Sequence, residues 1–250
     1  MSGKALAPSS SGPSRRTLLR DAALFGLGML GAAYPVFAAP KETGLPFEGL
    51  LKGKPGFQLR RPAPLPIAEI PGFLTKEQLA HNYSVYREAF ASLLIARTAL
   101  RSIPRDAAHA DAYGKLRIQQ ITAGNSILLH EFYFRNITPA RIKPSHYVLA
   151  NMTEHMGTLA DWREDFAACA RVAQAWAVLI YDPYDDRWHN APLARTDSGG
   201  WVGGNPLVVC DVAADAWAID YKNRAEYVAH FLDHLDWNIV AARYRAVDRH

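Results

Sequence analysis

The sequence predicts an α+β fold: an N-terminal antiparallel helical hairpin followed by a small three-stranded antiparallel sheet packed with helices. Three observations lead to this prediction. Two long stretches with apolar residues at helical spacing come first, three short apolar runs bounded by turn residues follow, and helical patterns surround those runs. With 250 residues, of which 49% are hydrophobic and 21% charged, the chain is large and apolar enough to bury a core, which excludes a disordered protein.

Residues 1–38 predict an export signal. The pair Arg15-Arg16 precedes an uncharged stretch, Ala22 to Phe37, and Val36-Phe37-Ala38 offers small or branched side chains where a signal peptidase cleaves. This resembles a bacterial twin-arginine signal, so we expect cleavage after Ala38 and a periplasmic protein with no stable membrane anchoring afterwards. The alternatives are an uncleaved N-terminal anchor or a chance Arg-Arg pair.

Charge and cysteine content narrow the function classes. Four basic residues and one acidic residue give the leader a net charge of +3, which leaves only +1 of the formal +4 for the rest. Nucleic acid is therefore not an expected partner. The two cysteines, Cys169 and Cys210, are too few for a disulfide framework and are expected as buried thiols.

The N-terminal half of the mature chain predicts an arm and a hairpin. Residues 39–66 contain six prolines and are expected to be extended, and the hairpin domain is assigned to residues 67–140. Thr75 and Gln78 have capping-box spacing at the start of a helix that runs to about Ser102. The second helix starts at about Ala107 or Asp111 and runs to Phe134. Expected inward side chains include Leu79, Tyr83, Tyr86, Phe90, Leu93, Leu94, Ala96, Leu116, Ile118, Ile121, Ile127, Leu128 and Phe132.

Residues 145–250 are assigned to a C-terminal α/β domain. Short helices are expected at 149–156 and, capped by Thr158, at 161–172. Strands are expected at 175–181, 187–194 and 206–211, and the clearest remaining helix runs from Tyr227 to about Tyr244.

Three of these elements present candidate metal ligands. His81 lies in the first long helix, His130 near the end of the second, and Asp211 at the end of the third strand, with Asp215 four residues on. Two imidazoles and two carboxylates form a mixed nitrogen and oxygen set that suits iron or manganese. Taken singly, each histidine is better explained as a hydrogen-bonded core residue than as a ligand, and Asp211 is better explained as a helix N-cap.

The surroundings of these residues resemble the iron/manganese superoxide dismutase family over roughly residues 64–245. The stretch Leu74 to His81 matches the family's first ligand helix, and His130-Glu131-Phe132-Tyr133-Phe134 matches its second ligand followed by aromatic residues. The block from Asp211 to Tyr227 aligns without gaps to the family's C-terminal signature, keeping Asp220, Tyr221, Asn223 and Tyr227. The resemblance implies one iron or manganese ion per subunit, superoxide as substrate, and His81, His130, Asp211 and Asp215 as metal ligands.

The sequence departs from the family pattern around the expected site. Asp215 takes the place of the fourth ligand, a histidine, and Ala214 that of a glutamate that bridges to a partner subunit. A homodimer would therefore lack its bridge. Further losses are the channel tyrosine at Ala89 and the family residues at Val85, Ala213 and Ala218, with no counterpart of the water-binding glutamine at Ser126 or near Trp176.

These departures predict weak dismutase activity or none, because an added carboxylate lowers the reduction potential and the proton supply is untuned. One alternative is a non-catalytic metal-binding protein or interaction scaffold. Another is a facial triad of His81, His130 and Asp211 with open positions. Two weaker patterns are interpreted as structural: the pair His230 and His234, and the turn with Asp182, Asp185 and Asp186.

Overall fold

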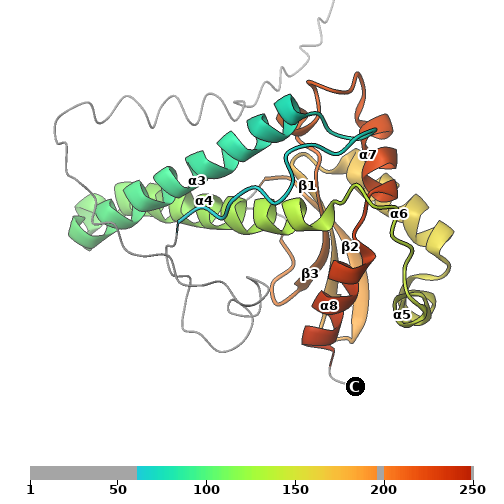
Figure 1. Ribbon diagram of the computed structural model, residues 1–250. Helices are drawn as coiled ribbons and strands as arrows, with labels where there is room; N and C mark the ends of the chain where they lie inside the picture. Colours follow the sequence, from blue (N-terminus) through green and yellow to red (C-terminus); the bar gives the residue numbers. More distant parts are fainter. Residues whose placement is uncertain (1–60, 196–199, 249–250) are drawn as a thin grey trace, which may run out of the picture. The chain divides into compact units, whose positions relative to one another are not determined.

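The computed structural model describes residues 61–195 and 200–248, all within one compact unit, Phe47–His250. The predicted export signal and the first part of the predicted arm lie outside these residues. The described part contains a helical hairpin, a three-stranded sheet and four further helices, which confirms the predicted α+β class (Figure 1). No helix among the described residues is long and apolar enough to cross a membrane.

The hairpin consists of α3 (Lys76–Ser102) and α4 (Ala110–Asn136), joined by a short 3-10 turn, Ala107–His109. Thr75 caps α3, because its hydroxyl accepts a hydrogen bond from the Gln78 N–H. The predicted capping box is only half formed. The Thr75 N–H donates to Asp220 instead, at 2.7 Å, and the Gln78 side chain points elsewhere.

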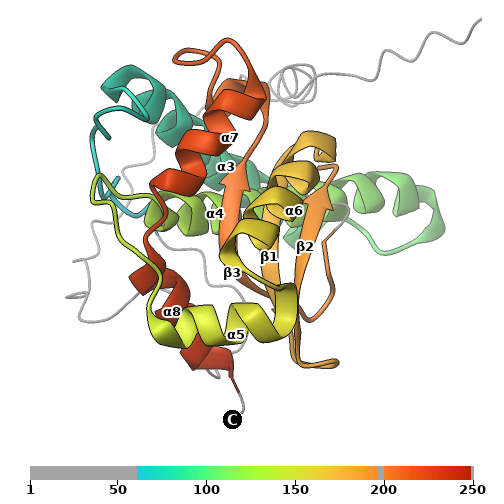
Figure 2. The same ribbon diagram turned by 90° about the vertical axis from the view of Figure 1, so that its right-hand side faces the viewer.

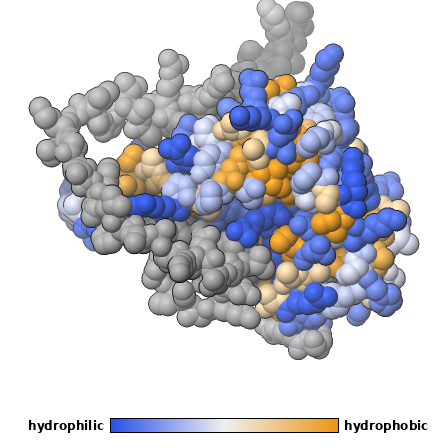
Figure 3. All heavy atoms as spheres, in the orientation of Figure 1, coloured by the Kyte–Doolittle hydropathy of each residue, from blue (hydrophilic) through white to orange (hydrophobic). Residues whose placement is uncertain are grey.

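For three side chains, the prediction that they face inward is wrong. Leu94 is 42% exposed, Ile118 53% and Ile121 47%. The physical reason is visible in Figure 1: the outer halves of α3 and α4 extend away from the sheet and contact each other, so one helix face has no neighbour to cover it. On the face shown in Figure 3, hydrophobic atoms form a group near the centre amid hydrophilic ones.

The sheet has the order β2-β1-β3 and is antiparallel throughout. Its strands are β1 (Trp176–Asp182), β2 (Arg187–Leu193) and β3 (Asn205–Asp211). All seven residues of β1 are buried, as expected for a central strand covered on both faces. In Figure 2, α6 (Leu159–Val172) lies in front of the sheet and the hairpin passes behind it.

The C-terminal helix differs from the prediction. The expected single helix from Tyr227 to Tyr244 is two helices, α7 (Arg224–Asp233) and α8 (Trp237–Val247). The break has two causes: Leu235 forms a β-bridge with Ile137, and the Asp236 side chain caps α8 by accepting hydrogen bonds from the N–H groups of its first turn. The remaining helix, α5 (His146–Met156), agrees with the prediction to within three residues.

Large buried aromatic residues form a substantial part of the core. The largest, each less than 2% exposed, are Trp162, Trp176, Trp188, Tyr86, Tyr133, Tyr181 and Tyr227. Arg243 of α8 is also buried and donates to Asn136, to the Leu207 carbonyl of β3 and to the Phe132 carbonyl of α4. It thereby ties α8 to both the hairpin and the sheet.

Candidate metal centre

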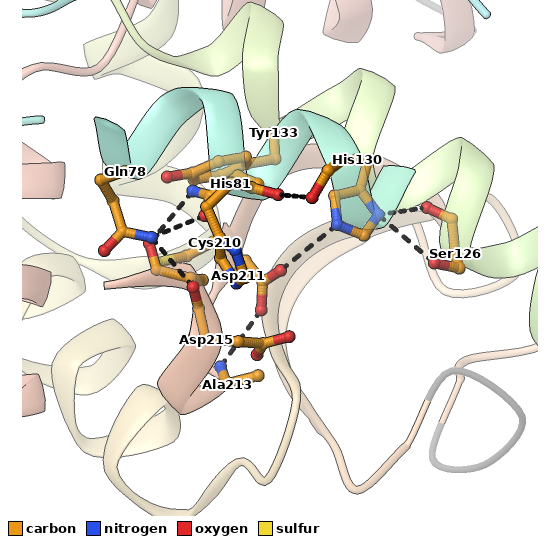
Figure 4. Close-up of polar contacts among 12 residues, drawn as sticks. Gln78, His81, Ser126, His130, Tyr133, Cys210, Asp211, Ala213 and Asp215 are labelled. Atoms are coloured by element: carbon orange, nitrogen blue, oxygen red, sulfur yellow. Dashed lines mark hydrogen bonds and ion pairs between the residues drawn. The ribbon is translucent and has the colours of Figure 1, made fainter. Parts of the chain in front are cut away.

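The candidate centre lies where α4 meets the end of β3. His130, 1% exposed, comes from α4, and Asp211, 3% exposed, is the last residue of β3. Asp211 is paired with Trp176 at the start of the central strand, so the sheet register fixes its position. His130 Nε2 and Asp211 Oδ2 are 3.6 Å apart and face each other (Figure 4).

The other nitrogen of His130 is held by its own helix. Nδ1 lies 2.7 Å from the Ser126 carbonyl oxygen, one turn earlier, and 3.3 Å from the Ser126 hydroxyl. Because a carbonyl only accepts, this contact places a proton on Nδ1, and it directs Nε2 toward Asp211. A ring nitrogen fixed in this way is typical of a metal-ligating histidine.

These two residues fit a shared metal ion. Two ligand atoms that each bind an ion at about 2.1 Å are separated by about 3–4 Å for ligand angles between about 90° and 140°. The 3.6 Å between His130 Nε2 and Asp211 Oδ2 falls within that range. The donor set is one imidazole nitrogen and one carboxylate oxygen, which iron and manganese both accept.

The other two predicted ligands lie nearby but form a looser group. Figure 4 shows the partly buried side chain of His81 coming from α3 beside Asp211, and Asp215 on the loop beyond β3. However, the described residues contain one set of three candidate ligands whose ligand atoms all lie within 4.8 Å of one another, and this set lies elsewhere. No three of the four predicted residues are that close together.

The loop that carries Asp215 is held against α3 by a buried amide pair that sequence analysis missed. Gln78 donates from Nε2 to the Asp215 carbonyl at 2.9 Å and to Asn82 at 2.7 Å, while its Oε1 accepts from the Ile219 N–H at 2.9 Å. Asn82 in turn donates to the Ala216 carbonyl at 3.0 Å. The signal in the sequence was two amides four residues apart on the inward face of the helix, but the capping-box spacing of Gln78 concealed it.

A second hydrogen-bonded group lies behind Asp211. The Tyr227 hydroxyl donates to Tyr133 at 3.1 Å and receives a weak hydrogen bond from the Cys210 thiol at 3.9 Å. Burial raises the pKa of all three groups well above their ordinary values. They stay neutral, so they add no negative charge to that of Asp211. Both cysteines are free and buried, as predicted.

The positions at which the chain departs from the family pattern differ in their exposure. Ala89 is buried at 8% exposed, whereas Ala214 and Ala218 are exposed. Glu131, next to His130, is buried and accepts a hydrogen bond from the Tyr86 hydroxyl at 2.7 Å. The predicted structural role of the pair on α7 and its C-cap is confirmed: His230 Nδ1 contacts the Gly72 carbonyl and His234 Nδ1 the His230 carbonyl.

Comparison with known proteins finds relatives whose names include iron or manganese. Residues 144–243 match the C-terminal domain of the iron/manganese superoxide dismutases. The chain is 29% identical over 123 residues to superoxide dismutase [Mn] 2 of Haloferax volcanii, covering 48% of this chain and 62% of that protein. It is 28% identical over 134 residues to superoxide dismutase [Fe] of Aquifex pyrophilus, covering 53% and 63%. It is 31% identical over 94 residues to superoxide dismutase [Mn] of Haloarcula hispanica, covering 37% and 65%. The chain thus spans less than two thirds of the length of these relatives.

Proposed function

We propose that the chain is a divergent member of the iron/manganese superoxide dismutase family that holds one iron or manganese ion at His130 and Asp211. His81 and Asp215 are the proposed remaining ligands. The observation that carries the proposal is the buried pair of His130 Nε2 and Asp211 Oδ2 at 3.6 Å, with the histidine proton directed away from it. A bound ion of this kind supplies one-electron chemistry, by which superoxide is converted to O2 and H2O2.

The residues around this pair determine the rate of superoxide dismutation. Asp215 adds a second carboxylate, which favours the more highly charged state of a bound ion and lowers its reduction potential. Ala89 contributes no hydroxyl, so the proton for peroxide formation has no donor at this position. We therefore propose slow dismutation, far below the diffusional ceiling of about 10⁸–10⁹ M⁻¹s⁻¹.

The test is superoxide decay after pulse radiolysis on purified protein reconstituted with iron or with manganese, with bound metal measured in the same sample. We expect close to one ion per chain at this centre and a measurable but slow decay rate. His130→Gln should lose both, whereas His109→Gln, on an exposed turn, should lose neither. Turnover at the diffusional ceiling, or full metal retention in His130→Gln, would contradict the proposal.

A second candidate function is a metal-binding protein without turnover. It is favoured by the two exposed alanines, Ala214 and Ala218, which replace the residues of the dimer bridge and the channel. The same experiment separates the two: bound metal with superoxide decay no faster than in the metal-free protein identifies the non-catalytic protein.

We also infer export to the periplasm, supported by Arg15-Arg16 ahead of the uncharged stretch that ends at Ala38. Replacing both arginines with lysine keeps the charge, and in a bacterium with the twin-arginine pathway it should leave the protein in the cytoplasm. Fractionation of cells that express both forms gives the result. Equal export of the two forms would contradict the inference.

A further inference from the structure

A second group of metal-ligating side chains lies at the opposite end of the central strand. Asp182 ends β1, Asp185 lies in the following turn, and His189 is on β2. One ligand atom from each lies within 4.8 Å of the other two. Asp211 pairs with the first residue of β1 and Asp182 is the seventh, so about 20 Å of strand separates the two groups.

The histidine and its neighbour Asp185 are already in contact. His189 Nε2 lies 2.8 Å from Asp185 Oδ2, and the other oxygen of Asp185 accepts the Arg187 N–H at 3.0 Å. The His189 ring stacks on Trp201, with centroids 4.5 Å apart and planes 13° from parallel. This stacking holds the ring so that Nε2 stays directed toward the carboxylates.

Asp182 gives an independent reason to expect a cation. It is 7% exposed, and its two oxygens accept one hydrogen bond each, from the Tyr184 N–H at 2.9 Å and the Trp201 indole N–H at 2.8 Å. Both donors are neutral, and no lysine or arginine of the described residues forms an ion pair with it. Burying a carboxylate without a counter-ion is unfavourable, and about half of the acceptor positions of Asp182 remain unused by these two donors.

Trp201 links the two sides of the group. It stacks on His189 and donates to Asp182, so one residue from the segment before β3 orients two candidate ligands. The turn behind it is closed by a hydrogen bond from the Gly204 N–H to the Trp201 carbonyl at 3.0 Å. This hydrogen bond helps to hold Trp201 in place.

We propose that Asp182, Asp185 and His189 form a second binding site, for a divalent first-row transition-metal ion. One imidazole and two carboxylates suit an ion such as Zn²⁺, with a fourth position left to water. Ca²⁺ fits poorly because it takes six to eight oxygen ligands. Binding of the ion uses the lone pair of His189 Nε2, so a proton on that nitrogen is displaced to solvent or to Nδ1.

The test titrates the full chain with ZnCl2 by calorimetry and counts bound Zn²⁺ after dialysis. We expect Asp185→Asn and His189→Gln each to bind one Zn²⁺ fewer than the wild type. Asp186→Asn is the matched control, since it removes the same charge from the same turn, and asparagine tolerates the positive φ of 56°. This control should bind as the wild type does, and His130→Gln should keep the ion at the second site.

Equal Zn²⁺ binding by the wild type, Asp185→Asn and His189→Gln would overturn the proposal. An equal loss in Asp186→Asn would also overturn it, because general charge attraction would then explain the binding. Stronger binding of Ca²⁺ than of Zn²⁺ would contradict the assignment of the site to a transition-metal ion. Quenching of Trp201 fluorescence by Co²⁺, absent in His189→Gln, gives a second readout that does not depend on the ion at His130.

Discussion

At the scale of single residues, the candidate centre depends on which atom of each side chain is already engaged. Ser126 holds His130 through Nδ1, and the Ala213 N–H holds Asp211 through Oδ1 at 3.1 Å. His130 Nε2 and Asp211 Oδ2 are the atoms that face each other. Backbone groups thus orient both proposed ligands before any ion binds.

Asp215 replaces a histidine of the family pattern, and a single substitution restores that histidine. In Asp215→His, a neutral imidazole replaces a carboxylate, which should raise the reduction potential of the bound ion. We expect superoxide decay to quicken by about tenfold, equal to about 1.4 kcal/mol of activation free energy. Pulse radiolysis of iron- and manganese-loaded protein measures this change.

The matched control is Lys222→His, which adds a histidine to an exposed position of the same segment. It should leave the decay rate unchanged. An unchanged rate in Asp215→His with full metal loading would show that the fourth position does not limit turnover.

Motifs in the sequence singled out His130 and Asp211, because one precedes a run of aromatic residues and the other ends an apolar strand, and the structure brings these two side chains together. The looser placement of His81 and Asp215 could not be predicted in this way. It depends on how the loop after β3 packs on α3, and that packing is set by Gln78 and Asn82, which are 137 and 134 residues away from their partners.

At the scale of elements, the buried amide pair connects the first long helix to the loop of the site. Gln78 and Asn82 are 0% and 2% exposed, and Gln78 satisfies three polar groups. Removing a partner from a buried polar group costs about 1–3 kcal/mol. The connection therefore stabilises the fold and positions Asp215 together.

Gln78→Met keeps the side-chain length but removes every hydrogen bond of this amide. We expect the free energy of unfolding to fall by about 3 kcal/mol or more, because three groups lose their partner. Urea unfolding followed by circular dichroism measures it. Gln119→Met removes only the partly exposed, longer hydrogen bonds to Ser92, at 3.1 and 3.3 Å, so it should cost less, about 1 kcal/mol. Equal effects of the two variants would refute the role of the pair.

Capping links the same two elements. The Thr75 hydroxyl accepts from the Gln78 N–H at 3.2 Å and donates to Asp220 at 2.7 Å. Thr75→Ala should cost about 0.5–2 kcal/mol, the usual range for loss of an N-cap. Thermal or urea unfolding gives the value, and Thr75→Ser, which keeps the hydroxyl, should restore most of it. A variant as stable as the wild type would mean that the Asp220 contact contributes nothing.

The secondary structure followed closely from local signals, and its errors have identifiable tertiary causes. The strands were predicted because their apolar runs are short and end at turns. The break between α7 and α8 was missed because it comes from a bridge between Leu235 and Ile137, almost a hundred residues apart. Leu94, Ile118 and Ile121 were placed inward because periodicity identifies an apolar face but not whether a neighbour covers it.

At the scale of the whole molecule, one buried and one partly buried histidine make stability depend on pH. Burial lowers the pKa of His155 and of His234 below the ordinary value. A histidine with a lowered folded pKa binds fewer protons in the folded state, so stability is full above about pH 6.5 and is lost as the pH falls below it.

We therefore expect metal-free protein to lose stability between about pH 7 and pH 5, and His155→Gln to lose less over that interval. Urea unfolding at a series of pH values measures both slopes. His109→Gln, with its ring exposed, should keep the wild-type slope. Identical slopes in His155→Gln and the wild type would contradict the assignment of part of this pH dependence to His155.

Binding of one iron or manganese ion between His130 and Asp211 is tested most directly by anomalous diffraction. Crystals of the protein loaded with each metal would be measured at the corresponding absorption edge. We expect a single-ion peak bound by His130 Nε2 and Asp211 Oδ2. A loaded crystal with no peak at this pair, or with a peak only at Asp182, Asp185 and His189, would contradict it.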